Sequence, residues 1–377
     1  MPKRPTILQV LPAMTSGGVE RGTVEISLAI VRAGWKSLVA SSGGPMVTGV
    51  SYTGGEHINL PLESKNPWVM YQNYHALVEV IKRHDVSIIH ARSRAPAWSA
   101  YYAAKKTGIP FVTTFHGVYG LESDWKRRYN SIMVKGDRVI AVSNYIRDHI
   151  LKEYECDPSK ITVIHRGADL AVFHPDNIAK GQLEILTKAW RLPEEPAPII
   201  LMPGRFSRWK GHEVLIKALA KLPNQHFLCI MMGDSTNHPD YTEELKKLVI
   251  REKLEGRVRF APNSKYMSEA YTLAEVVVVP SIEPEAFGRV PVEAQAMGKI
   301  VVTTNHGGAM ETVVEGETGF LVEPNNVDAM ARALQLVMEM GKDRKLEMEQ
   351  AAINHVWEHF SADLMRQKTL DVYQSLL

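Results

Sequence analysis

Residues 275–298, EVVVVPSIEPEAFGRVPVEAQAMG, join an apolar strand to a helix through a short polar loop. The run of four valines has no polar face, which is typical of a parallel strand covered on both sides. The helix is expected to begin near Gly288, because Pro291 is tolerated in the first helical turn. Two carboxylates, Glu285 and Glu293, therefore flank the start of this helix.

The same alternation of apolar strand and amphipathic helix runs along the whole chain, and it predicts parallel sheets with helices on both faces. The expected strands are 6–11, 36–41, 86–91, 110–115, 137–142 and 161–164, then 197–202, 226–231, 258–261, 275–280, 299–304 and 319–322. The expected helices are 19–32, 67–83, 95–106, 144–153, 211–222, 240–254, 289–297, 326–339 and 362–377.

The length of 377 residues is too great for one ordinary domain and fits two. A polar, proline-rich segment at 170–196 interrupts the alternation and is expected to be the linker. The sequence thus predicts an α/β fold of two doubly wound, Rossmann-like parallel-sheet domains facing across a cleft, residues 1–180 and 181–361. The last helix, 362–377, either caps the second domain or crosses back to complete the first.

The composition is that of a soluble globular protein, with 45% hydrophobic and 23% charged residues. No apolar run approaches the roughly 20 residues of a membrane span, and the short apolar start, broken by Pro12, is unlike a signal peptide. Cys156 and Cys229 form neither a disulfide framework nor a metal-ligand pair. These features predict a cytoplasmic protein.

Charge is unevenly distributed between the halves. Residues 1–180 hold 22 Lys and Arg against 15 Asp and Glu, whereas the remainder holds 22 against 27. A basic first half favours an anionic partner, although solvated surface charge explains the same numbers equally well.

The carboxylate pair indicates a ligand with both phosphate and hydroxyl groups. Ligands of doubly wound sheets bind at the carboxyl ends of the strands, and in two-domain proteins often between the domains. A helix start favours phosphate, Gly288 permits close approach, and carboxylates accept strong hydrogen bonds from hydroxyls. A nucleotide sugar has all these groups. The simpler alternative is that Glu285 favours the helix dipole and Glu293 pairs with Arg289 at i,i+4.

Two further loops add groups suited to such a ligand. The loop within PGRFSRWKGHEVLIKAL, residues 203–219, holds Arg205 and Lys210, two cations able to neutralise a diphosphate. Arg208 in the same loop is expected to be solvated. Gly17 and Gly18 precede a helix in MTSGGVERG and could turn backbone amides toward the ligand, but a plain tight turn explains them as well.

Three segments together resemble a known family. GRFSRWKG (204–211), EPEAFGRVPVEAQAMG (283–298) and NHGGAMETVVEGETGFLV (305–322) are similar to the retaining nucleotide-sugar glycosyltransferases of GT-B fold, of the group-1 or family-4 type. The resemblance covers nearly the whole chain and is strongest from 199 to 325. It implies that Glu285 contacts the donor sugar, Glu293 the ribose hydroxyls, and Arg205 and Lys210 the diphosphate.

The resemblance also assigns donor-binding roles to the backbone amides of Phe287, Gly288 and Arg289, and to Gly17, Gly18, Gly233 and Asn144. His116, in TFHGVYG, stands where the family often has a histidine near the reacting sugar. Three of these residues have an ordinary alternative. His116 would be a structural histidine, Asn144 a helix N-cap and Gly233 a turn residue.

HARSRAPAWSA (90–100) and EPEAFGRV (283–290) look most like the lipopolysaccharide-core branch of that family, often mannosyltransferases. This likeness implies GDP-mannose as donor and a lipid-linked saccharide as acceptor, with peripheral contact to the inner face of the cytoplasmic membrane and no nucleic-acid partner. The candidate contacts for the acceptor or the anionic membrane surface are Arg92, Arg94, Lys126, Arg127 and Arg128; solvated helix faces are the alternative.

The sequence contains no D-x-D motif, so no metal and no cofactor are expected. Charge on the leaving group would be met by Arg205, Lys210 and the helix start. The resemblance implies retention of anomeric configuration with front-face attack by the acceptor. Alternatives are a nucleotide-sugar epimerase, a non-catalytic nucleotide-sugar-binding protein and, much weaker, a hydrolase using Ser235.

Overall fold

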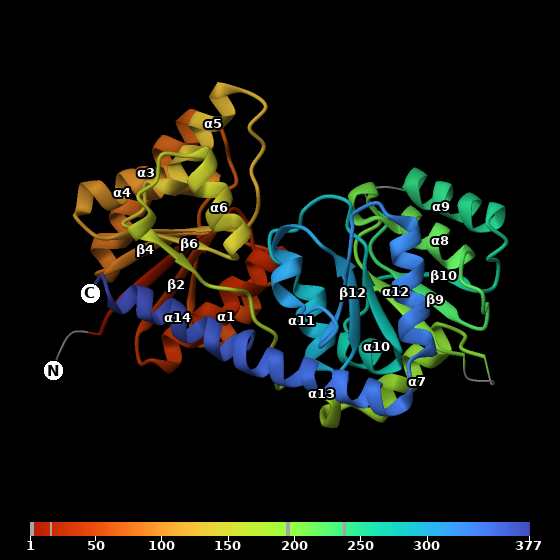
Figure 1. The fold of residues 1–377 in the computed structure, drawn as a ribbon. Coiled ribbons are helices and arrows are strands. Elements are labelled where there is room, and N and C mark those ends of the chain that lie inside the picture. Colours follow the sequence, from red (N-terminus) through yellow and green to blue (C-terminus); the bar gives the residue numbers. More distant parts are fainter. Residues whose placement is uncertain (1–3, 16, 194–196, 237–238) are drawn as a thin grey trace. The chain divides into compact units, whose positions relative to one another are not determined.

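The computed structural model describes residues 4–15, 17–193, 197–236 and 239–377 (Figure 1). The chain divides into two compact units. The first consists of residues up to His165 together with Asp363–Leu377, and the second is Arg166–Ala362. Each unit is built on one parallel sheet, so the predicted α/β fold of two parallel-sheet domains is confirmed.

The first unit contains a seven-stranded sheet of order β3-β2-β1-β4-β5-β6-β7. Its strands are β1 (Thr6–Val10), β2 (Lys36–Ser41), β3 (Glu56–Asn59), β4 (Ile88–Ala91), β5 (Phe111–Phe115), β6 (Arg138–Ala141) and β7 (Ile161–Val163). Strand β3 was missed from the sequence, because an edge strand is only half buried and its residues EHIN carry no apolar run. It pairs in parallel with β2, with Leu38 opposite Glu56.

Helices cover both faces of this sheet (Figure 1). They are α1 (Gly18–Arg32), α2 (Val47–Tyr52), α3 (Pro67–His84), α4 (Arg94–Thr107), α5 (Asp124–Asn130), α6 (Asn144–Glu153) and α14 (Ala362–Gln374), with 3₁₀ turns η1 (Ser131–Val134) and η2 (Pro158–Lys160). Met365, Val372 and Tyr373 of α14 join the core formed by α1 and the strands. Of the two alternatives for the last helix, the structure therefore has the one in which it packs in the first unit.

The second unit contains a six-stranded sheet of order β10-β9-β8-β11-β12-β13. Its strands are β8 (Ile199–Pro203), β9 (Leu228–Met232), β10 (Val258–Ala261), β11 (Val276–Val279), β12 (Ile300–Thr304) and β13 (Gly319–Val322). Every residue of β8, β9, β11 and β12 is buried, as expected for strands that are covered on both faces.

The helices of the second unit are α7 (Lys180–Ala189), α8 (His212–Ala220), α9 (Pro239–Arg251), α10 (Met267–Leu273), α11 (Arg289–Ala296), α12 (Val327–Glu339) and α13 (Lys342–His359), with turns η3 (Pro175–Asn177), η4 (Arg208–Lys210) and η5 (Gly307–Thr312). Helix α7 lies inside the segment expected to be an irregular linker, so that expectation was wrong there. Its Leu186, together with Trp190 just after it, is buried, and the helix packs against α10.

Candidate functional site

The candidate site lies where the strand order of the second sheet reverses. Strands β8 and β11 are neighbours in the sheet although two strands separate them in the sequence. Their two loops leave the sheet at its carboxyl edge, which is where open α/β sheets bind ligands. The loop after β8 carries Arg205 and Lys210, and the loop after β11 carries Glu285.

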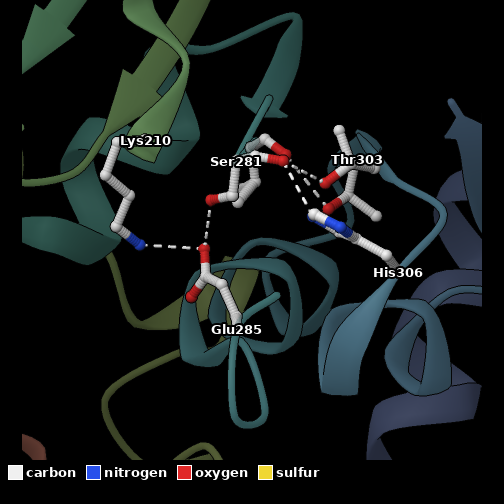
Figure 2. A network of polar contacts seen from close by, with 7 residues as sticks. Lys210, Ser281, Glu285, Thr303 and His306 are labelled. Atoms are coloured by element: carbon white, nitrogen blue, oxygen red, sulfur yellow. Dashed lines mark hydrogen bonds and ion pairs between the residues drawn. The ribbon is translucent and has the colours of Figure 1, made fainter. Parts of the chain in front are cut away.

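Lys210 and Glu285 meet as an ion pair. The Nζ atom of Lys210 donates a hydrogen bond to Oε1 of Glu285 at 2.8 Å, and the same carboxylate oxygen accepts from the Ser281 hydroxyl at 2.6 Å (Figure 2). The side chains of Lys210 and Glu285 are only 12% and 13% exposed. Two ionised groups are thus held in a fixed geometry and partly removed from water, which strengthens their action on a bound ligand.

A second layer of contacts fixes the loop that carries Glu285. The carbonyl oxygen of Ser281 accepts a hydrogen bond from His306 Nε2 at 2.9 Å (Figure 2). It accepts a second one from Thr304 Oγ1 at 2.8 Å. The amide of Gly308 donates to the carbonyl oxygen of Glu285 at 2.7 Å. Sequence reasoning gave no role to Ser281, Thr304 or His306, although the His-Gly-Gly triplet after an apolar strand was the available signal.

Two glycines let the backbone segments of the site approach closely. Gly211 has a φ of 76°, and a Cβ atom built there would lie 1.9 Å from the carbonyl oxygen of Pro280. At Gly307, with φ of 64°, a Cβ would lie 2.7 Å from the carbonyl oxygen of Glu285. A side chain at Gly211 would push the Lys210 loop away from the end of β11, and one at Gly307 would push the loop after β12 away from the Glu285 loop.

The second carboxylate has its own partners. Tyr271 donates its hydroxyl to Oε2 of Glu293 at 3.1 Å, and Arg289 Nε lies 3.5 Å from Oε1 of Glu293. The Arg289–Glu293 pair at i,i+4, which was the simpler explanation of Glu293, is therefore present. Gly288 is the N-cap of α11 with a φ of 92°, and the buried Phe287 ring lies 5.8 Å from that of Phe360.

The remaining residues of the β8 loop differ in their surroundings. Arg205 is exposed, whereas Arg208 pairs with Glu213 and Glu244 at 3.3 and 2.5 Å on the outer surface. Gly233, which follows β9, lies directly against Gly204, since a Cβ there would be 1.9 Å from the Gly204 carbonyl oxygen. A requirement for close backbone packing thus accounts for this glycine.

Beneath the β8 loop, His212 is fully buried at the first position of α8. Its ring lies 5.0 Å from that of Phe206 and 5.9 Å from that of Tyr241. Burial, with a smaller effect of the nearby Lys210 charge, lowers the pKa of His212 to about 3. The imidazole is therefore neutral at physiological pH and supports the loop by packing.

The first unit holds the other predicted donor contacts. Gly17 is the N-cap of α1, and its extended backbone makes no demand for glycine. His116 lies in the loop after β5. Ser143, and not Asn144, caps α6 by accepting from the Ile146 amide at 3.1 Å, so the N-cap alternative for Asn144 was wrong.

The five candidate acceptor contacts fall into different environments. Arg92 is buried and donates to Gln9 Oε1 at 3.1 Å. Arg94 donates to Asn130 Oδ1 at 2.9 Å and, like Lys126, lines a cavity of the first unit. Arg127 pairs with Glu153 at 3.1 Å, and Arg128 is exposed.

Successive parts of the chain match two protein families. Residues 16–172 match "Glycosyltransferase Family 4", and residues 186–355 match "Glycosyl transferases group 1". The crystal structure of a glycosyltransferase from Rickettsia africae ESF-5 is 42% identical, with a TM-score of 0.92 over 99% of this chain and 98% of that one. This chain belongs to the glycosyltransferase family. Its two parallel-sheet units are those of the GT-B fold.

More distant relatives of this glycosyltransferase have different names; one was solved with bound ligands, and another is named for a substrate. Anabaena HepE, solved in complex with UDP and glucose, is 23% identical with a TM-score of 0.85, over 99% of this chain and 100% of that one, which is a likeness in fold. D-inositol 3-phosphate glycosyltransferase from Streptomyces avermitilis is 28% identical over 77% of this chain and 65% of its own length. The present chain thus matches just under two thirds of that relative.

In residues 4–15, 17–193, 197–236 and 239–377, no cluster of three or more His, Cys, Asp or Glu side chains is placed to hold a metal ion. Within the same described ranges, no helix is both long and apolar enough to cross a membrane.

Proposed function

We propose that this glycosyltransferase moves a hexose from a nucleotide sugar to a saccharide acceptor, with retention of anomeric configuration and without a metal ion. The observation that carries the proposal is the Lys210–Glu285 ion pair at the reversal point of the second sheet. A cation for phosphate and an acceptor for hydroxyls stand 2.8 Å apart there, which matches a molecule whose diphosphate adjoins a sugar.

The ion pair has a direct part in binding the donor. A lysine ammonium has three donors, so Lys210 can keep its hydrogen bond to Glu285 while donating to a phosphate oxygen. Arg205, exposed on the same loop, adds a second cation for the diphosphate. Glu285, oriented by Ser281, accepts from a hydroxyl of the transferred sugar. Glu293 has the corresponding role toward the ribose.

In the transfer step, the acceptor hydroxyl oxygen bonds to the anomeric carbon as the bond from that carbon to the phosphate oxygen breaks. The proton of the acceptor hydroxyl passes to the departing phosphate oxygen on the same face. Negative charge develops on the nucleoside diphosphate, and Lys210 and Arg205 stabilise it from fixed positions. No protein nucleophile takes part, which accounts for retention by front-face attack.

The donor proposed first is GDP-mannose, with a lipid-linked saccharide of the lipopolysaccharide core as acceptor and peripheral contact with an anionic membrane surface. The likeness of residues 90–100 and 283–290 to that branch supports this choice. A UDP sugar is the second candidate, because HepE was solved with UDP and glucose. The name of the Streptomyces relative adds an inositol phosphate as a candidate acceptor.

A thermal-shift panel with nucleotide diphosphates and their sugars, with and without magnesium, tests the proposal, since a bound ligand raises the melting temperature by mass action. We expect a shift with GDP and GDP-mannose that does not depend on magnesium. A shift with UDP compounds alone would exclude GDP-mannose and keep the nucleotide-sugar transfer. Conversion of a nucleotide sugar without acceptor would indicate an epimerase, and the absence of any shift would overturn the proposal.

A further inference from the structure

The first unit contains a cavity of about 1,030 Å³ that no part of the donor site uses. Its walls come from α3, α4 and α5, and its aromatic lining consists of Tyr71, Tyr74, Trp98, Tyr102, Trp125 and Tyr129. We call it the aromatic cavity. Its volume lies just above the range of about 300–1,000 Å³ for small-molecule sites, so it has room for more than one sugar ring.

The aromatic rings stack on one another at the surface of the unit and are not buried in its hydrophobic core. Trp125 and Tyr129 stack with centroids 5.5 Å apart and planes only 9° apart, and Trp98 lies 6.1 Å from Tyr129. Trp98 Nε1 also donates to the carbonyl oxygen of Tyr129 at 3.2 Å, which ties α4 to α5. Yet Tyr71 is 54% exposed and Trp125 is 70% exposed. Packing does not explain large aromatic side chains left this open to water.

Part of the lining of the aromatic cavity comes from the edge of the sheet where a ligand is expected. Pro12 follows β1 and Ser93 follows β4, and both line the cavity. These two strands are neighbours at the point where the order of the first sheet reverses. Beside them Arg94 is held by its hydrogen bond to Asn130 and lies over the Tyr119 ring at 4.3 Å. The guanidinium of Arg94 is thus held in place beside the aromatic lining, at the carboxyl edge of the sheet.

The lining distinguishes a saccharide from an acyl chain. Five charged residues share the walls with the rings, namely Glu63, Lys65, Arg94, Glu122 and Lys126. Four of these residues are exposed, so an acyl chain would cover only part of the charged side chains, but it would return no hydrogen bonds to the part that it covers, which is unfavourable. A saccharide offers hydroxyls to the charged groups and flat C–H faces to the rings, so both parts of the lining are satisfied.

We infer that the aromatic cavity is the acceptor site and takes an oligosaccharide of two or more rings stacked on its aromatic side chains. This inference rests on the proposed function, since an acceptor presupposes transfer. It places acceptor recognition on Tyr71 and Trp125 as well as on Arg94 and Lys126, and it assigns none to the buried Arg92.

The test measures binding of lipid-free oligosaccharides by calorimetry and saturation-transfer NMR on the full chain. The probes are the core oligosaccharide released from lipopolysaccharide and a linear mannose oligosaccharide. We expect Trp125→Ala and Tyr71→Ala each to weaken binding about tenfold or more, as for aromatic residues at binding hot spots. Tyr52→Ala is the matched control, because Tyr52 is 92% exposed in the same unit and does not line the cavity.

GDP and UDP titrations of the same variants separate the two proposals. Unchanged nucleotide binding with weakened oligosaccharide binding supports the inference. The inference is overturned if the protein binds nucleotides normally but binds no oligosaccharide. It is also overturned if both variants bind the oligosaccharide as well as the unaltered protein does. Either result leaves the proposed function standing. A third outcome is that the protein binds anionic vesicles but no oligosaccharide, and that Trp125→Ala and Tyr71→Ala weaken the vesicle binding. This outcome would assign the cavity to a lipid surface and would also overturn the inference.

Discussion

The reversal points of the two sheets carry different chemistry. In the second unit, the loops after β8 and β11 hold the partly buried Lys210–Glu285 ion pair, and glycines bring the backbone segments together. In the first unit, the loops after β1 and β4 open into a cavity walled by six aromatic side chains. The same sheet architecture thus supports a compact charged site and a broad aromatic one. The first suits phosphate and hydroxyl groups, and the second suits extended sugar faces.

The largest effect is expected at Glu285. Replacement of Glu285 by Gln removes the charge beside Lys210 and should lower turnover by about 10²–10³-fold while nucleotide binding is largely kept. Initial rates with saturating donor, together with calorimetry for the nucleotide, measure the two effects. Glu283→Gln is the control, because Glu283 is exposed two residues away. Normal transfer by Glu285→Gln would remove Glu285 from the site.

The backbone contact of the charged site can be tested at Gly211. A Cβ there meets the Pro280 carbonyl oxygen at 1.9 Å, whereas Gly256 has a similar φ of 78° and nothing within 4 Å. Gly211→Ala should therefore lower the free energy of unfolding by about 1–3 kcal/mol more than Gly256→Ala. Urea unfolding compares the two. Equal losses would mean that the loops do not need this close approach.

The cations of the charged site should determine affinity for the diphosphate. Lys210→Ala and Arg205→Ala each remove a charge-assisted hydrogen bond, worth about 1.5–3 kcal/mol, so nucleotide diphosphates should bind roughly tenfold to a hundredfold more weakly. Calorimetry gives the dissociation constants. Arg208→Ala, which loses the exposed pairs with Glu213 and Glu244 and the contact with the Tyr241 ring, should bind normally. Affinity unaffected by Lys210→Ala would contradict the proposed contact.

The effect that is smallest at neutral pH concerns His212, because it appears only as the pH falls below 6.5. Its pKa is lowered to about 3 in the folded chain, whereas an unfolded histidine binds a proton near pH 6.5. Below pH 6.5 the unfolded state therefore holds the extra proton, and this group's contribution to stability falls by up to about 1.4 kcal/mol per pH unit until pH 3. Above pH 6.5 the contribution is constant.

His212→Phe removes the titration and keeps an aromatic ring between Phe206 and Tyr241. Urea unfolding of both proteins between pH 7 and pH 4 should show a shallower loss of stability in the variant. Parallel curves would show that His212 is protonated in the folded chain as readily as in the unfolded one.

Much of the fold was predictable from local pattern. The apolar runs at β8 and β11 have the length and β-branched content of buried strands, and residues 144–153 form the helix that their periodicity predicts. Strand β3 and helix α7 were missed because neither is more than half buried, so packing against β2 and α10 decides them more than their own residues do.

Part of the candidate site was also predictable, because the position of a loop follows from the strand before it. Loops that follow buried strands must lie at the carboxyl edge of a parallel sheet, so Arg205, Lys210 and Glu285 could be assigned to one edge from the sequence. The support from Ser281, His306 and Gly307 was not predicted, because it depends on contacts between loops. Ser281 donates to Glu285, His306 donates to the Ser281 carbonyl oxygen, and Gly307 lies against the Glu285 backbone.

The sequence by itself determined that two parallel α/β sheets form and which loops bear charge, because strand periodicity and loop position are local properties of the chain. Only the tertiary structure decided that Lys210 pairs with Glu285 across 75 positions, and that rings from three helices enclose one cavity. Contacts between distant segments depend on the order in which strands join a sheet, and that order is fixed by the packing of the whole unit.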